Sequence, residues 1–140
     1  MFRRVQGRTK LMWLPVTPST DFPAGALVAF DNGKLVPATT DTPGYSIIGV
    51  IRHAITEKDS DYDQDRLVEV EVPIEKNVIW EATASTELSA SNVGQYYDLD
   101  DSSTVNLNAN TNSIVFCVKD VDTTKGWFIL NIGPDASVKA

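Results

Sequence analysis

The stretch GALVAFDNGKLVPATTDTPGYSIIGV, residues 25–50, is the part of the sequence that decides the fold. An apolar run leads into Asn32 and Gly33, a pair that accepts positive φ and therefore favours a tight hairpin turn. The chain returns over residues 34–38, and after a Pro-Gly turn a β-branched segment follows at 45–55. Three short strands joined by two turns predict an antiparallel β scaffold, and none of its residues is an obvious catalyst.

Alternation of apolar and polar residues predicts further strands. In the segment 66–74 the valines share one face and Glu69 and Glu71 lie on the other, which predicts a half-buried strand with both carboxylates exposed. We expect this strand to form a second hairpin with residues 77–83, in which Trp80 anchors the core.

The second half of the chain continues this pattern of short strands and polar turns. A helical turn is expected within residues 86–93, where Ser85 or Thr86 can cap it and Gly94 can end it. Roughly eight or nine short strands without a long helix are typical of all-β proteins. We therefore predict an all-β fold, a compact β-sandwich or a β-barrel-like domain of the β-tulip type. Further strands are expected at residues 95–99, 114–119 and 127–132.

Length and composition bound the domain organisation. A chain of 140 residues, 42% of them hydrophobic, suits one globular domain, which we place at residues 21–133 between an N-terminal arm, 1–20, and a C-terminal tail, 134–140. Cys117 is the one cysteine, so an intramolecular disulfide is excluded and a reducing cytoplasm is expected. The sequence shows no signal peptide and no apolar run of the roughly 20 residues that a membrane span needs.

The charge is unevenly distributed along the chain. Residues 1–10 carry a net charge of +4 and residues 11–140 carry −11, which together give −7. A basic segment ahead of an acidic body is typical of an interaction tail, and the acidic body repels phosphate and so disfavours nucleic-acid binding. The basic side chains are those of Arg3, Arg4, Arg8 and Lys10.

An apolar motif, LMWLPV at residues 11–16, follows the basic segment directly. Trp13 either caps the domain's own core or anchors the arm on a partner. We predict the second arrangement, in which residues 1–16 reach away from the β domain and dock on an acidic or apolar groove. The anchoring residues are then Leu11, Trp13 and Leu14, while the four basic side chains set orientation and association rate.

Residues that carry chemistry are few in this sequence. His53 is the only histidine and shares a register with Ile51 and Ile55, so we expect it in a core or an interface. With Cys117 in an apolar strand and no GxSxG, Walker or GxGxxG motif, the sequence offers neither a nucleophile–base pair nor a usual zinc site. The acidic loop at 56–66 lacks the closing Glu of an EF-hand, so we expect an exposed, mobile loop that needs no calcium. We predict no enzymatic activity, no metal and no cofactor.

Several strands are apolar on both faces. A small sandwich buries one face of each strand, so a two-sided apolar strand needs a second packed layer or a subunit interface. We predict self-association through such strands. The residues assigned to this interface are Ile47, Ile48, Val50 and Ile51, and the strand at 115–118 has the same character.

The order of these motifs resembles the small capsid decoration, or cement, proteins of tailed bacteriophages. The motifs are GALVAFDNGKLVPAT, YSIIGV, RLVEVEVPIEKNVIWEA, ASNVGQYYDL and GWFILNI, which together span about residues 24–132. The resemblance implies a compact β fold on the outside of a phage head that bridges subunits of the major capsid protein and is often a homotrimer. It also implies a protein made in the host cytoplasm and carried on the virion exterior. The basic segment at 1–10 has no counterpart among these motifs.

Two other classes of protein stay open at this point. A carbohydrate-binding β-sandwich presents an aromatic surface, for which the sequence offers Trp13, Tyr45, Tyr62, Tyr96 and Tyr97. A head- or tail-completion protein of a phage differs from a cement protein in partner and copy number. A hydrolase is disfavoured, because nucleophile, base and metal ligands are missing from the sequence.

Overall fold

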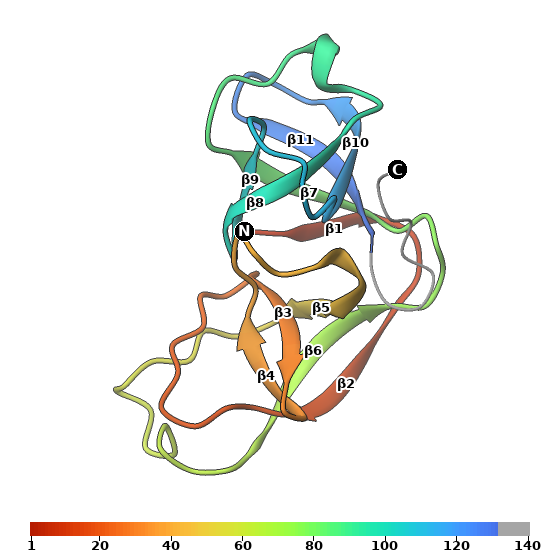
Figure 1. Cartoon of the computed structure of the whole chain (residues 1–140). Helices are drawn as coiled ribbons and strands as arrows, with labels where there is room; N and C mark the ends of the chain where they lie inside the picture. The colour runs from red at the N-terminus through yellow and green to blue at the C-terminus, as the bar shows by residue number, and fades with distance from the viewer. Residues whose placement is uncertain (132–140) are drawn as a thin grey trace.

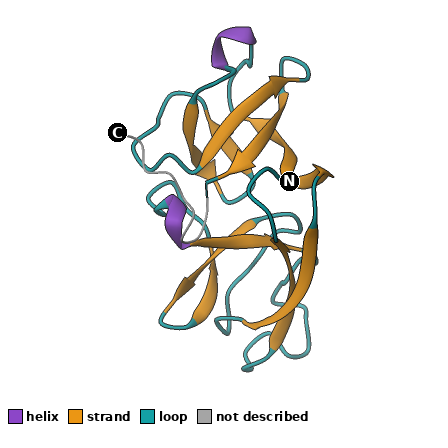
Figure 2. Cartoon of the chain, turned by 90° about the vertical axis from the view of Figure 1, so that its right-hand side faces the viewer, coloured by secondary structure: helices purple, strands orange, loops and turns teal. Residues whose placement is uncertain are grey.

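The computed structural model describes residues 1–131 and is nearly all β, which confirms the predicted fold class. Two sheets, A and B, are stacked end to end and linked by strands that run from one into the other (Figures 1 and 2). The tail predicted at 134–140 lies outside the described residues. The strands are β1 (Arg3–Gln6), β2 (Thr9–Pro15), β3 (Leu27–Asp31), β4 (Lys34–Pro37), β5 (Ile47–Ile51), β6 (Leu67–Pro73), β7 (Ile79–Ala84), β8 (Tyr96–Asp101), β9 (Thr104–Asn106), β10 (Val115–Asp120) and β11 (Lys125–Leu130), and the 3-10 turns are η1 (Gly44–Ser46) and η2 (Ala90–Asn92).

Sheet A closes into a barrel. Its strands follow the order β1-β7-β11-β10-β8-β9, and a parallel pairing of β9 with β7 leaves β7, β11, β10, β8 and β9 as a closed five-stranded barrel. β10 pairs with β11, with Cys117 opposite Phe128. The expected helical turn is η2, but its N-cap is Ser89 rather than Ser85 or Thr86.

Sheet B has five antiparallel strands in the order β2-β6-β5-β3-β4. The hairpin predicted around Asn32 and Gly33 is β3–β4, and these residues have φ of 51° and 81°, the left-handed values that an Asn-Gly hairpin turn requires. A parallel bridge between Val16 and Leu35 draws the end of β2 against β4, so the sheet curls around its own core.

One two-stranded ribbon runs through both sheets. β1 pairs with β7 in sheet A and β2 pairs with β6 in sheet B, so each long segment contributes to both halves (Figure 1). Gly7 makes the bend between β1 and β2: its φ is +99°, and a Cβ there would lie 2.8 Å from the Cα of Val78. The second hairpin predicted between residues 66–74 and 77–83 is therefore wrong, because β6 and β7 pair with other strands in different sheets.

The N-terminal segment is part of the fold and not an arm. β1 and β2 take up most of residues 3–15, and Phe2 and Val16, which flank them, are each 2% exposed. The arm predicted at 1–20 is thus wrong. The physical reason is that the seven residues of β2 pair along their whole length with β6. The main-chain hydrogen bonds and the apolar burial that follow offset the entropy lost on ordering the segment.

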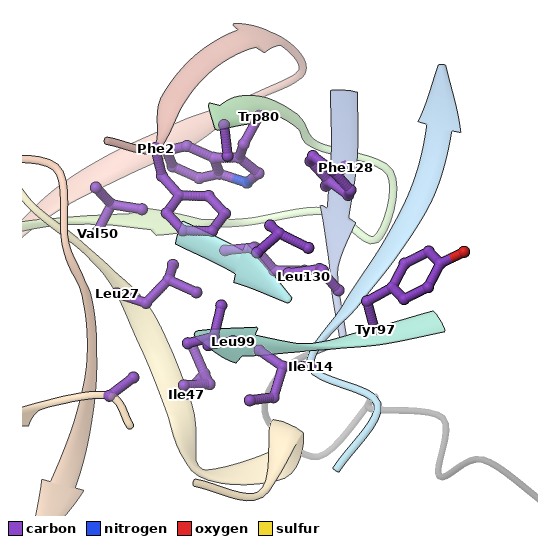
Figure 3. Close-up of a cluster of buried hydrophobic side chains, with 14 of the residues drawn as sticks. Phe2, Leu27, Ile47, Val50, Trp80, Tyr97, Leu99, Ile114, Phe128 and Leu130 are labelled. Atoms are coloured by element: carbon purple, nitrogen blue, oxygen red, sulfur yellow. The ribbon is translucent and has the colours of Figure 1, made fainter. Parts of the chain in front are cut away.

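Two apolar clusters fill the interior. The larger lies in the barrel and in its contact with sheet B: Figure 3 shows Phe2 beside Trp80 of β7, with Val50 and Leu27 from sheet B close by. Because residues of both sheets share this cluster, the two halves are packed together rather than only joined by connecting chain. The smaller cluster lies within sheet B and consists of Val16, Phe22, Ala26, Val28, Leu35, Ile51, Ile55 and Val70.

The strand assigned to self-association is covered by its own chain. Ile47, Val50 and Ile51 are 0%, 2% and 1% exposed, so they do not form a subunit interface as predicted. Ile48 is half-buried. β5 is apolar on both faces because it lies between the two clusters, with Ile47 and Val50 in the larger and Ile51 in the smaller. The second packed layer that a strand with two apolar faces needs is therefore supplied by the same chain.

Candidate functional site

Trp13 is 63% exposed, the highest value among the large apolar side chains of residues 1–131. It lies on β2, and the alternation of side chains along a strand puts Leu11 on the same face. The register with β6 places Trp13 opposite Glu69 and Pro15 opposite Leu67, so Leu67 shares that face as well. Leu11 and Leu67 are 47% and 57% exposed. The three apolar side chains form a surface that we call the Trp13 face.

The two faces of β2 have different surroundings. Leu14 points to the opposite face, where it is half-buried and packs against the smaller cluster, so it does not share the Trp13 face as the predicted set of docking residues requires. On the Trp13 side, Leu27, Val50, Glu71 and Leu11 follow one another in register across β3, β5, β6 and β2. The larger cluster covers Leu27 and Val50 only. The outermost part of this face is therefore left open.

A buried carboxylate lies next to the Trp13 face. Glu71 is 8% exposed, contrary to the exposed position that alternation predicts. Its carboxylate accepts hydrogen bonds from Nε of Arg4 at 2.8 Å and from the hydroxyl of Thr9 at 2.7 Å, and a guanidinium nitrogen of Arg52 lies 3.5 Å away. These contacts pair the charge and satisfy the oxygens, which is the condition for burying a carboxylate. They also fasten β1 to sheet B.

The arginines of the N-terminal segment pair with carboxylates of this chain. That they meet an external acidic surface stays a prediction, because the side chains of Arg3 and Arg8 are still 60% and 76% exposed. The hydrogen bonds from Arg8 lower the pKa of Glu75. Lys10 is exposed and makes no ion pair within residues 1–131. The nitrogen–oxygen distances are 3.1 Å for Arg3–Glu81, 2.8 Å for Arg4–Glu71 and 3.0 Å for Arg8–Glu75.

A cleft of about 210 Å³ opens beside Trp13. Its far wall is the acidic loop, which Arg66 holds against sheet B: the guanidinium bonds to the carboxylate of Asp61 and lies 3.4 Å from that of Asp59. The hydrogen bond from Arg66 lowers the pKa of Asp61. Leu67 and Glu69 also line the cleft, and the sequence did not mark them as site residues. They lie beside Trp13 because β2 pairs with β6. This pairing joins residues far apart in the sequence, so no local pattern could predict it.

His53 and Cys117, the two groups considered for catalysis, have different surroundings. Of the two places expected for His53, a core or an interface, the structure excludes the core, because β5 ends at Ile51 and the imidazole beyond it is 80% exposed. Its Nε2 lies 3.7 Å from Oε1 of Glu69. Cys117 is buried, and burial raises the pKa of its thiol to about 11, so the thiol stays protonated at neutral pH. Within residues 1–131, no group of three or more His, Cys, Asp or Glu side chains is placed to hold a metal ion.

The aromatic residues considered for a carbohydrate surface do not lie together. Tyr62 packs against the smaller cluster and Tyr97 lies in the larger one. Tyr96 is half-buried and makes a ring contact on the barrel. The side chain of Tyr45 lies outside the described residues. The described part of the chain therefore brings Trp13 alone of this set to the cleft.

No protein-family model matches this chain, and no curated protein matches it either. Among the helices of residues 1–131, none has the length and apolar character that a membrane crossing requires. The site therefore has to be interpreted from its own geometry: an exposed apolar surface on a paired strand, with a cleft beside it that is lined by carboxylates.

Proposed function

We propose that this protein is a structural virion protein that binds the outer surface of a phage capsid and stabilises it by bridging subunits of the major capsid protein. The observation that carries the proposal is the Trp13 face, in which an indole that is 63% exposed lies with Leu11 of β2 and Leu67 of β6 on two paired strands. Tryptophan is prominent among the residues that dominate binding energy at protein interfaces. The resemblance to decoration proteins, which rests on strand and turn motifs, supports a capsid as the partner.

A docking surface on a paired strand has an energetic advantage over a free arm. An unstructured arm loses about 1–2 kcal/mol of backbone entropy per residue when it docks, and a preformed strand avoids that cost. β2 is paired with β6 from Thr9 to Pro15. We therefore assign docking to Leu11, Trp13 and Leu67 in place of the paired arginines.

The proposal includes self-association as a homotrimer, which follows from the same resemblance, and no enzymatic activity. The outer surface of the barrel supports a contact between copies, because four half-buried apolar side chains follow one another in register across β8, β10, β11 and β7. Sedimentation of the purified protein over a range of concentrations tests the trimer in solution. A protein that is monomeric at every concentration, and is also bound as separate monomers on the capsid, contradicts self-association. The four side chains are those of Tyr96, Phe116, Ile129 and Ile79.

Capsid binding is tested by adding the purified protein to phage heads that lack it and counting the copies bound per particle. We expect saturation at a number that scales with the subunits of the major capsid protein. Trp13→Ala should weaken binding about thirtyfold, which corresponds to the loss of one hot-spot side chain. Phe30→Ala, which removes an aromatic ring of 39% exposure on β3, is the matched control and should bind normally. A handful of copies per head, or full binding by Trp13→Ala, contradicts the proposal.

A further inference from the structure

Each sheet contains a tryptophan directly opposite a glutamate. In sheet A, Trp127 of β11 lies opposite Glu81 of β7. In sheet B, Trp13 of β2 lies opposite Glu69 of β6. Residues opposite each other in an antiparallel pair share one face, with Cβ atoms about 5 Å apart. Each pair therefore sets an indole beside a carboxylate, but the cations around the two pairs differ.

The pair in sheet A finds its cations within the chain. The ammonium nitrogen of Lys119 lies 4.7 Å from the centroid of the Trp127 ring, which is a cation–π contact. Arg3 pairs with Glu81 at 3.1 Å, and the indole Nε1–H of Trp127 donates to the same carboxylate at 3.2 Å. The indole bond and then Arg3 lower the pKa of Glu81, so this carboxylate stays charged beside the ring.

The pair in sheet B has the same two groups without such cations. Among residues 1–131, no lysine or arginine lies over the indole of Trp13, which is 63% exposed. The ion-pair partner of Glu69 is His53, whose Nε2 is 3.7 Å away, beyond hydrogen-bond distance. The ring and the carboxylate both face the cleft. The indole is open to a group from outside the chain, and the Glu69 side chain beside it is 19% exposed.

The charges around the cleft favour a cation. Its ionisable lining groups are the guanidinium of Arg66, the imidazole of His53 and three carboxylates, those of Asp59, Asp61 and Glu69. Arg66 contacts both aspartates and so neutralises only part of this charge. An anionic ligand is repelled by the remaining carboxylates and a cationic one is attracted. A cleft of about 210 Å³ admits the end of one long side chain.

We propose that Trp13 and Glu69 form a receptor for one basic side chain, an arginine or a lysine, on the capsid surface. In sheet A the cations next to Trp127 and Glu81 are those of Lys119 and Arg3. In sheet B the basic side chain of the partner takes the corresponding place next to Trp13 and Glu69. A guanidinium fits best, because it is planar, stacks on aromatic rings and is more weakly hydrated than an ammonium. The inference rests on the proposed function for the identity of the partner, while the chemistry of the site stands on its own geometry.

The chemistry is tested first without a capsid. The full-length protein, labelled with ¹⁵N, is titrated with N-acetylarginine amide and, separately, with N-acetylcitrulline amide, which has the same shape and no charge. The chain has three tryptophans, and the indole signal of Trp13 is the one missing from Trp13→Phe. We expect that signal to shift with the arginine probe alone and to stay in place in Glu69→Gln. Equal shifts with both probes, or none with either, overturn the inference.

Capsid binding by conservative variants is the second test. Trp13→Leu keeps an apolar side chain without a π face and should bind about tenfold more weakly, whereas Trp13→Phe keeps a ring and should lose about threefold at most. Glu69→Gln should bind about fivefold more weakly. The control is Glu87→Gln, which makes the same charge change at an exposed residue that does not line the cleft and should bind normally. Circular dichroism confirms that each variant is folded.

The outcomes separate the two proposals. If Trp13→Leu binds as tightly as the natural chain while Trp13→Ala does not, the Trp13 face is a purely apolar anchor. The cation receptor is then wrong and the proposed function stands. If Trp13→Ala also binds as tightly as the natural chain, the docking proposal itself fails.

Discussion

Trp80 in sheet A is 0% exposed, whereas Trp13 in sheet B is 63% exposed, although both lie within paired strands. β7, which carries Trp80, has β11 on one side and β1 and β9 on the other, and its inner face lines the closed barrel. β2, which carries Trp13, is one of the two edge strands of sheet B. The comparison teaches that the closure of a sheet, and not the residue type, decides which large apolar side chains become core and which stay available for binding.

Removal of the two indoles tests this comparison and gives the largest expected effect. Trp80→Ala should lower the free energy of unfolding by about 3–5 kcal/mol, because it leaves a cavity in the barrel. Trp13→Ala should change it by less than about 0.5 kcal/mol, because the side chain is at the surface. Chemical denaturation followed by circular dichroism measures both values. Equal losses in the two variants contradict the comparison.

A second variant keeps this test usable if Trp80→Ala leaves no folded protein. Trp80→Phe keeps an aromatic ring in the barrel and removes the indole N–H, which is buried without a hydrogen-bond partner. Its loss of stability should be smaller than that of Trp80→Ala and still larger than that of Trp13→Ala.

The sheets also differ in how they hold a buried carboxylate. Asp98 of β8, 2% exposed, accepts hydrogen bonds from the backbone N–H groups of Thr111, Asn112 and Ser113 at 3.0, 2.7 and 2.9 Å. Asp98→Ala leaves these three donors without their acceptor and should cost about 3 kcal/mol. The control Asp100→Ala changes an exposed residue of the same strand and should melt like the natural chain. A similar melting temperature for both variants contradicts the role of Asp98.

Substitution of Glu71, the buried carboxylate of sheet B, should reduce the stability of the fold less than substitution of Asp98 does. Glu71→Gln keeps the shape of the side chain and loses the charge that pairs with Arg4 and Arg52. Both arginine side chains are 44% exposed, so water compensates in part and we expect a loss of about 1–2 kcal/mol. Because Arg4 fastens β1, amide hydrogen exchange should accelerate in β1 more than in β11. Unchanged exchange in β1 shows that the strand is held without this pair.

The smallest expected effect is the pH dependence that Glu81 contributes. The hydrogen bond from Trp127 and then the charge of Arg3 lower the pKa of Glu81 from its ordinary value of 4.5. A carboxylate with a lowered pKa in the folded state stabilises the fold above that value, and the stabilisation is lost as the pH falls through the lowered pKa. Glu81→Gln should therefore lose less stability on acidification than the natural chain, by under about 1 kcal/mol. Parallel acid denaturation curves for the two proteins contradict this contribution.

Local sequence determined where most strands and turns lie. The turn at Asn32 and Gly33 and the alternation at 66–74 were predictable, because turn chemistry and period-two patterning act among neighbouring residues. The structure realises them as the β3–β4 turn and as β6. The place of Trp13 is a different matter. The sequence allowed a position in the core or on a partner, and we predicted an anchor on a free arm, whereas the structure sets Trp13 on β2, paired with β6.

Only the tertiary structure decided which strands pair and which faces are covered. β6 pairs with β2 and β5 and not with the next strand along the chain, so an N-terminal segment that looked like a free arm became part of both sheets. Arg4 and Glu71, 67 residues apart, form a pair that makes a nominally solvent-facing glutamate a buried one. The physical reason is that burial and charge pairing depend on contacts between segments that are far apart in the sequence. A pattern among neighbouring residues does not specify those contacts.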